Sequence, residues 1–355
     1  MARNKMPDQD NGSSLLEQKL LSVDNYLKDP ANIDNAPKMV VLHSERGMIL
    51  AQMHRWEESA ASFGKVIEIA EAGDAPDVKA RGYYLQASSL LRLPDQVDAC
   101  RHAITQAIHN AELTENDDLA GKGRLLLALQ HTNVGDLPEA SQELDRAIKL
   151  INPEVDALPA VQALRLRASF SLMQFDLDAS SAGLEKALAL AKKDRNVRLE
   201  QEIELELAVV GLFFSPEEQF QNPEELFGDL IKRAAATGNR DLYGSAQLFH
   251  AVAHIQRGKF ESALRHAEEA RQEALSAPDI QRYIRYFLAC ILISNARELL
   301  DDKPGALKIL LTCQRTMSNE LSETSAQAME PFFDFLRLRW GEETYNAVRR
   351  ASQSN

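Results

Sequence analysis

Residues 128–147 read ALQHTNVGDLPEASQELDRA, and this stretch shows most clearly the pattern from which the fold follows. Ala140, Leu144 and Ala147 are spaced by four and three residues, so their side chains share one face of a helix. Another small residue, Ala128, stands twelve positions before Ala140. The segment between the two halves, VGDLP, has the composition of a turn. This stretch therefore predicts two helices joined by a tight connection.

The same arrangement recurs along the chain as a small residue, an apolar residue four positions later and a small or apolar residue three beyond that. The triplets are Ser59/Phe63/Val66, Cys100/Ile104/Ala107, Ala140/Leu144/Ala147, Ser180/Leu184/Ala187, Ala263/Ala267/Ala270 and Ala306/Leu310/Cys313. Twelve positions before each triplet stands a further small residue: Gly47, Ser88, Ala128, Ala168, Ala251 and Ser294. Small side chains let two helices cross closely. Repeated helix hairpins of this kind indicate a solenoid.

The pattern resembles the tetratricopeptide repeat, in which a tryptophan-like site and small and aromatic positions recur on two helices. The matching residues are Gly47, Trp56 and Phe63 in one unit, Leu127, Ala128, Leu137, Ala140 and Ala147 in a second, and Phe260, Ala263 and Ala270 in a third. The resemblance implies an all-α fold, a right-handed α-solenoid of stacked antiparallel helix hairpins. Successive anchors lie 41, 40 and 40 residues apart, against about 34 in the standard repeat, so the chain is similar to the extended repeat type.

The predicted organisation has three parts. Residues 1–35 are expected to form a flexible N-terminus and a capping helix, residues 36–320 about seven hairpins with an irregular unit near 197–236, and residues 321–355 C-terminal capping helices. The irregular segment 213–223 is a candidate hinge. A group of apolar residues near the C-terminus is too apolar to be left in water. It is expected to form either a cap on the array or an interface with another molecule. The residues are Phe332, Phe333, Phe335, Leu336, Leu338 and Trp340.

Composition narrows the function classes. The chain has 355 residues and a formal charge of −13, which argues against general affinity for nucleic acid. No apolar run is long enough to span a membrane, and the N-terminus lacks the apolar centre of a secretory signal, so we expect a cytoplasmic protein. Cys100, Cys290 and Cys313 form an odd, widely spaced set, which predicts buried thiols.

The sequence gives little support for catalysis or for a cofactor. It contains no glycine-rich phosphate loop and no Gly-x-Ser-x-Gly elbow. His250 and His254 are spaced so that two imidazoles could share a metal ion, but the sequence suggests no third ligand at a sensible spacing. We therefore predict a non-enzymatic protein with no catalytic residues, no metal and no cofactor.

The resemblance also implies a binding surface, because in this family the first helix of each hairpin lines the concave groove. Carried onto this sequence, the partner-binding residues are Met48, Leu85, Arg92, Lys122, Leu125, Leu129, Arg165, Leu248 and Val252. Such a surface suits a helix or an extended peptide with apolar anchors and some acidic character.

Two hypotheses about function follow. The first is a scaffold or adaptor that binds a peptide or helix of a partner protein in the groove. The second is a regulatory sensor whose solenoid changes conformation when a peptide binds. Homo-oligomerisation stays open, and the sequence does not identify the partner.

Overall fold

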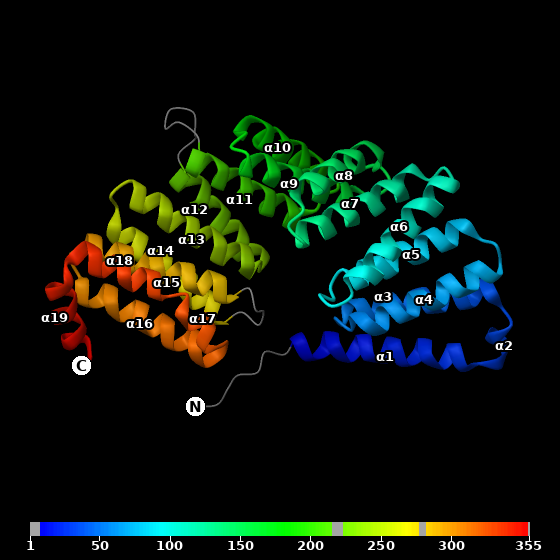
Figure 1. Ribbon diagram of the computed structural model, residues 1–355, viewed down its shortest axis with the longest axis horizontal. Helices are drawn as coiled ribbons and strands as arrows, with labels where there is room; N and C mark the ends of the chain where they lie inside the picture. The colour runs from blue at the N-terminus through cyan, green and yellow to red at the C-terminus, as the bar shows by residue number, and fades with distance from the viewer. Residues whose placement is uncertain (1–7, 215–222, 277–281, 354–355) are drawn as a thin grey trace. The chain divides into compact units, whose positions relative to one another are not determined.

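The computed structural model describes residues 8–214, 223–276 and 282–353, and every regular element in these ranges is a helix (Figure 1). The chain divides into two compact units, Met1–Asp194 and Arg195–Asn355. Within the described ranges, no helix has both the length and the apolar character needed to cross a membrane. The candidate hinge, residues 213–223, falls mostly outside them, as do the first seven residues of the predicted N-terminal segment.

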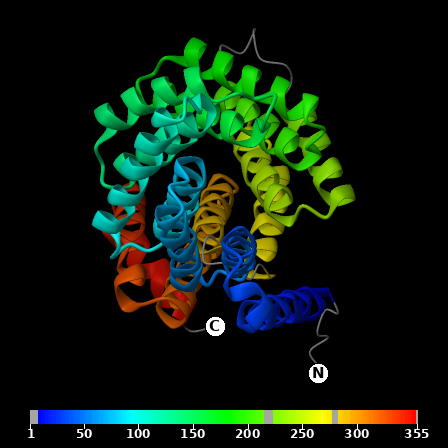
Figure 2. The ribbon, with the colours of Figure 1, turned by 90° about the vertical axis from the view of Figure 1, so that its right-hand side faces the viewer.

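The first unit is a stack of helix hairpins. Its helices are α1 (Asp8–Lys28), α2 (Pro30–Ile33), α3 (Ala36–Gln52), α4 (Trp56–Ala72), α5 (Pro76–Leu90), α6 (Val97–Leu113), α7 (Asp117–Asn133), α8 (Leu137–Leu150), α9 (Ala157–Met173) and α10 (Leu177–Lys193). From α3 to α10 consecutive helices pack on one another, as the blue to green ribbons of Figure 2 show. The predicted fold class, a solenoid of stacked helix hairpins, is confirmed.

The small residues of the repeat lie where the helices cross. A Cβ atom added to Gly47 would lie 2.6 Å from Cζ of Phe63, so only glycine lets α3 and α4 approach this closely. The hydroxyl of Ser59 donates to the carbonyl oxygen of Gly47 at 2.8 Å and lies 2.9 Å from Oγ of Ser89. Because these buried hydroxyls have partners, serine replaces alanine at the crossing without an unsatisfied polar group.

Nine of the connections between helices share one backbone feature, a left-handed residue. After α3, His54 has a left-handed conformation with φ 58°, and the N–H of Arg55 donates to the carbonyl oxygen of Leu50 at 2.9 Å. This geometry satisfies carbonyl groups at the helix end. Left-handed residues also follow α4, α6, α7, α9, α10, α12, α13 and α15: Asp74, Glu115, Gly135, Phe175, Arg195, Gly238, Gly258 and Asp301.

Helix α1 covers the first hairpin. Leu20 and Val23 are buried against Leu42 and Leu50 of α3. Arg46 of α3 adds an ion pair to Asp24, with 2.8 Å between Nε and Oδ1. The face of α3 that points toward α1 is therefore covered by α1. The opposite face of α3 stays available for contact with another molecule.

The second unit continues the pattern with α11 (Val197–Phe214), α12 (Pro223–Thr237), α13 (Arg240–Gln256), α14 (Phe260–Ser276), α15 (Arg282–Leu299) and α16 (Lys303–Glu320). Its predicted triplets are buried, as are those of the first unit. Cys290 and Cys313 are free and buried here, and Cys100 is free and buried in the first unit, so the predicted buried thiols are confirmed.

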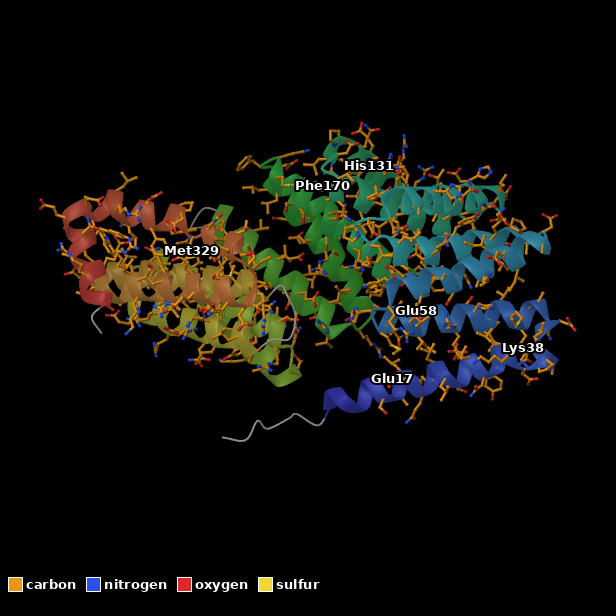
Figure 3. All side chains as sticks on the ribbon, turned by 60° about the horizontal axis from the view of Figure 1, so that its bottom comes forward. Glu17, Lys38, Glu58, His131, Phe170 and Met329 are labelled. Atoms are coloured by element: carbon orange, nitrogen blue, oxygen red, sulfur yellow. The ribbon has the colours of Figure 1, made fainter. Side chains whose placement is uncertain are left out.

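Three further helices close the C-terminal end: α17 (Glu323–Gln327), α18 (Glu330–Trp340) and α19 (Glu342–Gln353). Met329, labelled in Figure 3, is fully buried, and Phe333 and Leu336 of α18 join the same core cluster. Phe335 and Leu338 are exposed instead. These two residues lie on the opposite side of the helix from Phe333 and Leu336, so the core covers only part of the apolar group, and the interface alternative stays a prediction for the rest.

Candidate partner-binding groove

One wall of a groove in the first unit is the free face of α3. The helix begins after Asn35, whose side chain caps it, and Pro37 occupies its first turn. On the face turned away from the buried core, Val41 is 62% exposed and Met48 is 47% exposed. Ser44 lies between them, and its hydroxyl donates to a carbonyl oxygen of its own helix. This wall therefore presents apolar surface to solvent.

The facing wall is α5. Pro76 occupies the first turn of this helix. Asp77, Val78, Arg81 and Leu85 follow with spacings of one, three and four residues, so they form one stripe along the helix. All four line the same cavity as Val41 and Met48.

The floor and the far end come from α4 and from the start of α7. A Cβ atom added to Gly82 of α5 would lie 2.9 Å from Cγ1 of Ile67, so glycine allows α5 to approach α4 closely. The cavity has a volume of about 890 Å³, within the range of about 300–1,000 Å³ that is common for ligand sites. It is lined by Val40, Val41, Ser44, Glu45, Met48, Val66, Asp77, Val78, Arg81, Gly82, Leu85, Asn116 and Leu119.

Three charged side chains stand at this cavity. Glu45, Asp77 and Arg81 are exposed, and within the part of the chain that the structure describes none of them forms an ion pair. The neighbouring Lys79 differs, because its Nζ lies 3.0 Å from Oε1 of Glu71. The groove thus combines apolar surface with one guanidinium and two carboxylates that are free to pair with another molecule.

Comparisons with known proteins agree with this architecture. No family model matches the chain, and no curated protein matches it. Among solved structures, the apo form of the quorum sensor NprR from B. thuringiensis is similar with a TM-score of 0.63 and 16% identity, over 86% of this chain and 82% of that one. The apo form of RapI is similar with a TM-score of 0.54 and 12% identity, over 74% of this chain and 93% of that one.

A third similar structure contains tetratricopeptide repeats. It is a signal transduction ATPase with numerous domains from Pyrococcus horikoshii that carries a tetratricopeptide repeat sensor, with a TM-score of 0.62 and 15% identity over 88% of this chain. The chain is a tetratricopeptide-repeat-type solenoid. It spans half the length of the ATPase. At these identities the likeness establishes the fold of the solenoid and leaves its ligand to be inferred from its own residues.

The solenoid brings two of the predicted partner-binding residues together at the cavity. Met48 comes from α3 and Leu85 from α5, and both line it. Val41 and Ser44, which occupy inner positions of the same repeat, line it as well. Of the nine predicted residues, Met48 and Leu85 therefore line this cavity.

Four other predicted residues pack against neighbouring helices. Leu125 of α7 is 4% exposed, in a core cluster with α8 and α9, and Leu129 is half-buried against the same cluster. Leu248 of α13 is 5% exposed against Ala270 and Ala289. Val252 is half-buried against the cluster around Phe227. These side chains support the helices that carry the inner face.

The predicted basic residues already have contacts within the chain. Lys122 is half-buried, and its Nζ lies 2.9 Å from Oδ2 of Asp118 and 3.5 Å from Oδ2 of Asp156. The guanidinium of Arg92 lies 5.8 Å from the ring centroid of Trp56. Arg165 is half-buried on α9. The exposed cation at the cavity is Arg81, which is not among the predicted residues.

The sequence did contain a signal for the residues that were missed. Val78 and Arg81 lie seven and four positions before Leu85, so they continue its stripe toward the start of α5. The repeat pattern points to positions close to the conserved small residue, here Ser88, and does not reach this first part of the helix. Extending the helical period from Leu85 would have found them.

The structure also brings a third histidine to His250 and His254. His266 of α14 lies beside both, with ring centroids 4.1 Å from His250 and 5.1 Å from His254. This corrects the expectation that no third ligand is suitably placed. The sequence contained a signal for this third histidine. His266 follows His254 by twelve residues, the same spacing that separates the two small residues Ala251 and Ala263 at the crossing of the hairpin.

Proposed function

We propose that this solenoid binds a short polypeptide segment of a partner protein in the groove between α3 and α5. The observation that supports it is the open cavity of about 890 Å³ with Val41 and Met48 exposed on its wall. Apolar side chains that stay exposed beside a cavity are typical of sites that bury a partner's anchors.

The charges of the groove define the partner further. Arg81 would pair with a carboxylate of the bound segment, and Glu45 and Asp77 with basic side chains. A segment with apolar anchors and at least one acidic side chain fits this arrangement. Lys122 does not contribute to that preference, because Asp118 and Asp156 already neutralise it.

The first test uses peptides selected from a random display library against the full-length protein. Val41→Asp combined with Met48→Asp places two charges in the groove at exposed positions, so the fold should survive. We expect at least about a tenfold loss of affinity, because apolar anchors dominate interfaces of this kind. Fluorescence anisotropy with a labelled selected peptide measures the loss, and helical circular dichroism checks the fold.

The matched control is Leu21→Asp combined with Leu113→Asp. These two leucines are 63% and 65% exposed and lie in the same unit but do not line the cavity. Their replacement should leave binding unchanged. If the groove variant binds the selected peptides as tightly as the wild type, the peptide site lies elsewhere.

A second candidate function is a sensor that responds to the bound peptide. It is favoured by the similar structures, since NprR is described as a quorum sensor and the ATPase carries a tetratricopeptide repeat sensor. Small-angle scattering with and without a selected peptide separates the two functions. A scaffold should keep its radius of gyration at saturating peptide, and a sensor should change it.

A further inference from the structure

Three histidines meet inside one hairpin of the second unit. His250 and His254 lie on α13, one helical turn apart, and His266 lies on α14. The ring centroids of His250 and His254 are 4.4 Å apart. One ring nitrogen from each of the three residues lies within 4.8 Å of the other two. The hairpin thus gathers three nitrogen donors in one place.

Three ring nitrogens of two buried histidines lack hydrogen-bond partners among the described residues. His250 and His254 are each 7% exposed. Among the described residues, neither ring nitrogen of His250 has a partner, and Nδ1 of His254 has none. Buried polar atoms in folded proteins nearly always have a partner. A ligand bound by one ring nitrogen of His250 would give that buried atom a partner.

The surroundings orient the other donors. Nδ1 of His266 lies 2.6 Å from Oε1 of Gln247, and since an amide oxygen can only accept, Nδ1 carries the proton and Nε2 keeps a lone pair. Nδ1 of His254 lies 3.6 Å from Oε1 of Glu224. An acceptor behind the imidazole is the usual arrangement around histidine ligands of metal ions.

Burial also changes the pKa of these histidines. Burial is the main cause that lowers the pKa of His250 and of His266 to about 4, and the neighbouring histidines add to it. Burial lowers the pKa of His254 as well. Lys259, which hydrogen-bonds to Glu224, holds the pKa of that carboxyl below its usual range.

We propose that His250, His254 and His266 bind a divalent transition-metal ion, with Gln247 and Glu224 as positioning residues behind His266 and His254. Zinc is the best match, because three imidazoles are an established ligand set for zinc and leave its fourth position for water or another ligand. Magnesium does not fit, because it requires oxygen ligands. The bound ion would tie α13 to α14 in the middle of the unit.

The direct test uses the full-length protein after removal of metal with a chelator. Zinc is added, excess is removed by gel filtration, and bound metal is measured by mass spectrometry. We expect about one zinc per chain and no retained magnesium. Cobalt in place of zinc should give the visible absorption of a low-coordinate site, a signature that an ion on the surface does not produce. Substoichiometric zinc in the wild type would overturn the proposal.

Variants locate the ion. His250→Ala and His266→Ala should each lower zinc affinity more than tenfold, and Gln247→Leu should lower it about ten- to a hundredfold by releasing His266. His109→Ala, an exposed histidine on α6, is the matched control and should bind zinc like the wild type. If a ligand variant fails to fold, three measurements still test whether the histidines bind the ion: the wild-type stoichiometry, the cobalt spectrum and the zinc affinity of Gln247→Leu. Equal zinc binding by His250→Ala would show that the ion lies elsewhere.

Discussion

Helices α5 and α13 occupy the same place in their hairpins but present very different surfaces. Leu85 and Leu248 each stand three residues before the small residue of their repeat. Leu85 is half-buried and lines a cavity, whereas Leu248 is buried against Ala270 and Ala289. Repeat register therefore sets the direction of a side chain, and the neighbouring hairpin decides whether that direction leads to solvent or to a core.

The largest expected effect tests this contrast directly. Leu248→Asp and Leu125→Asp each place a charge in a packed cluster, which we expect to cost roughly 4 kcal/mol or more of unfolding free energy. Met48→Asp occupies an inner position that faces solvent, so its cost should stay within about 0.5 kcal/mol. Urea unfolding followed by circular dichroism measures all three. Equal destabilisation by Met48→Asp would mean that the groove wall is part of the core.

A smaller expected effect concerns how tightly the first helix of each hairpin packs against its neighbours. Gly47→Ala in α3 would push a methyl group into the ring of Phe63, at 2.6 Å from Cζ, and should cost about 1–3 kcal/mol. Gly244→Ala in α13 meets Cγ of Glu273 at 3.3 Å, which a flexible side chain can relieve. Because alanine favours a helix over glycine by about 0.5–1 kcal/mol, this second change should be neutral or stabilising.

Thermal unfolding distinguishes the two glycine variants, with the wild type as reference. A stabilising Gly47→Ala would show that Phe63 can move aside. In that case close packing would not explain glycine at this position.

The smallest effect concerns two cations of the first unit. Burial opposes the charging of Lys122, but the hydrogen bond and charge of Asp118 outweigh it and raise the pKa of Lys122. Lys122→Met breaks this contact and should cost about 0.5–1 kcal/mol. Arg81→Met removes a cation without an ion pair among the described residues and should leave stability unchanged within about 0.5 kcal/mol. Chemical unfolding of the two variants under identical salt tests whether only the paired cation contributes.

The sequence was sufficient for the helices and their pairing. Triplets such as Ala140, Leu144 and Ala147 are fully buried. A helix face of small and apolar residues that recurs at a fixed interval packs against the neighbouring helices of a solenoid. The C-terminal segment was harder to predict. Phe333 and Phe335 look equivalent in composition, but only Phe333 reaches the core, since the helix turns their side chains to opposite sides.

The candidate groove was predicted only in part. Met48 and Leu85 follow from the register of the repeat, but the exposure of each inner position depends on the helix that packs beside it. Leu125 and Leu248 are covered for this reason. The ion pairs of Lys122 are only partly visible in the sequence, because Asp118 lies four residues away but Asp156 lies 34 residues away.

The left-handed residues after the helices have a consequence for how such a chain changes in length. Several of them, including His54, Glu115 and Phe175, are not glycine, so the joints are formed by backbone geometry and do not require one special residue. A duplicated hairpin inserted at such a joint would meet the same helix faces above and below it. Gene duplication could therefore lengthen or shorten the array while each remaining interface keeps its complementary partner.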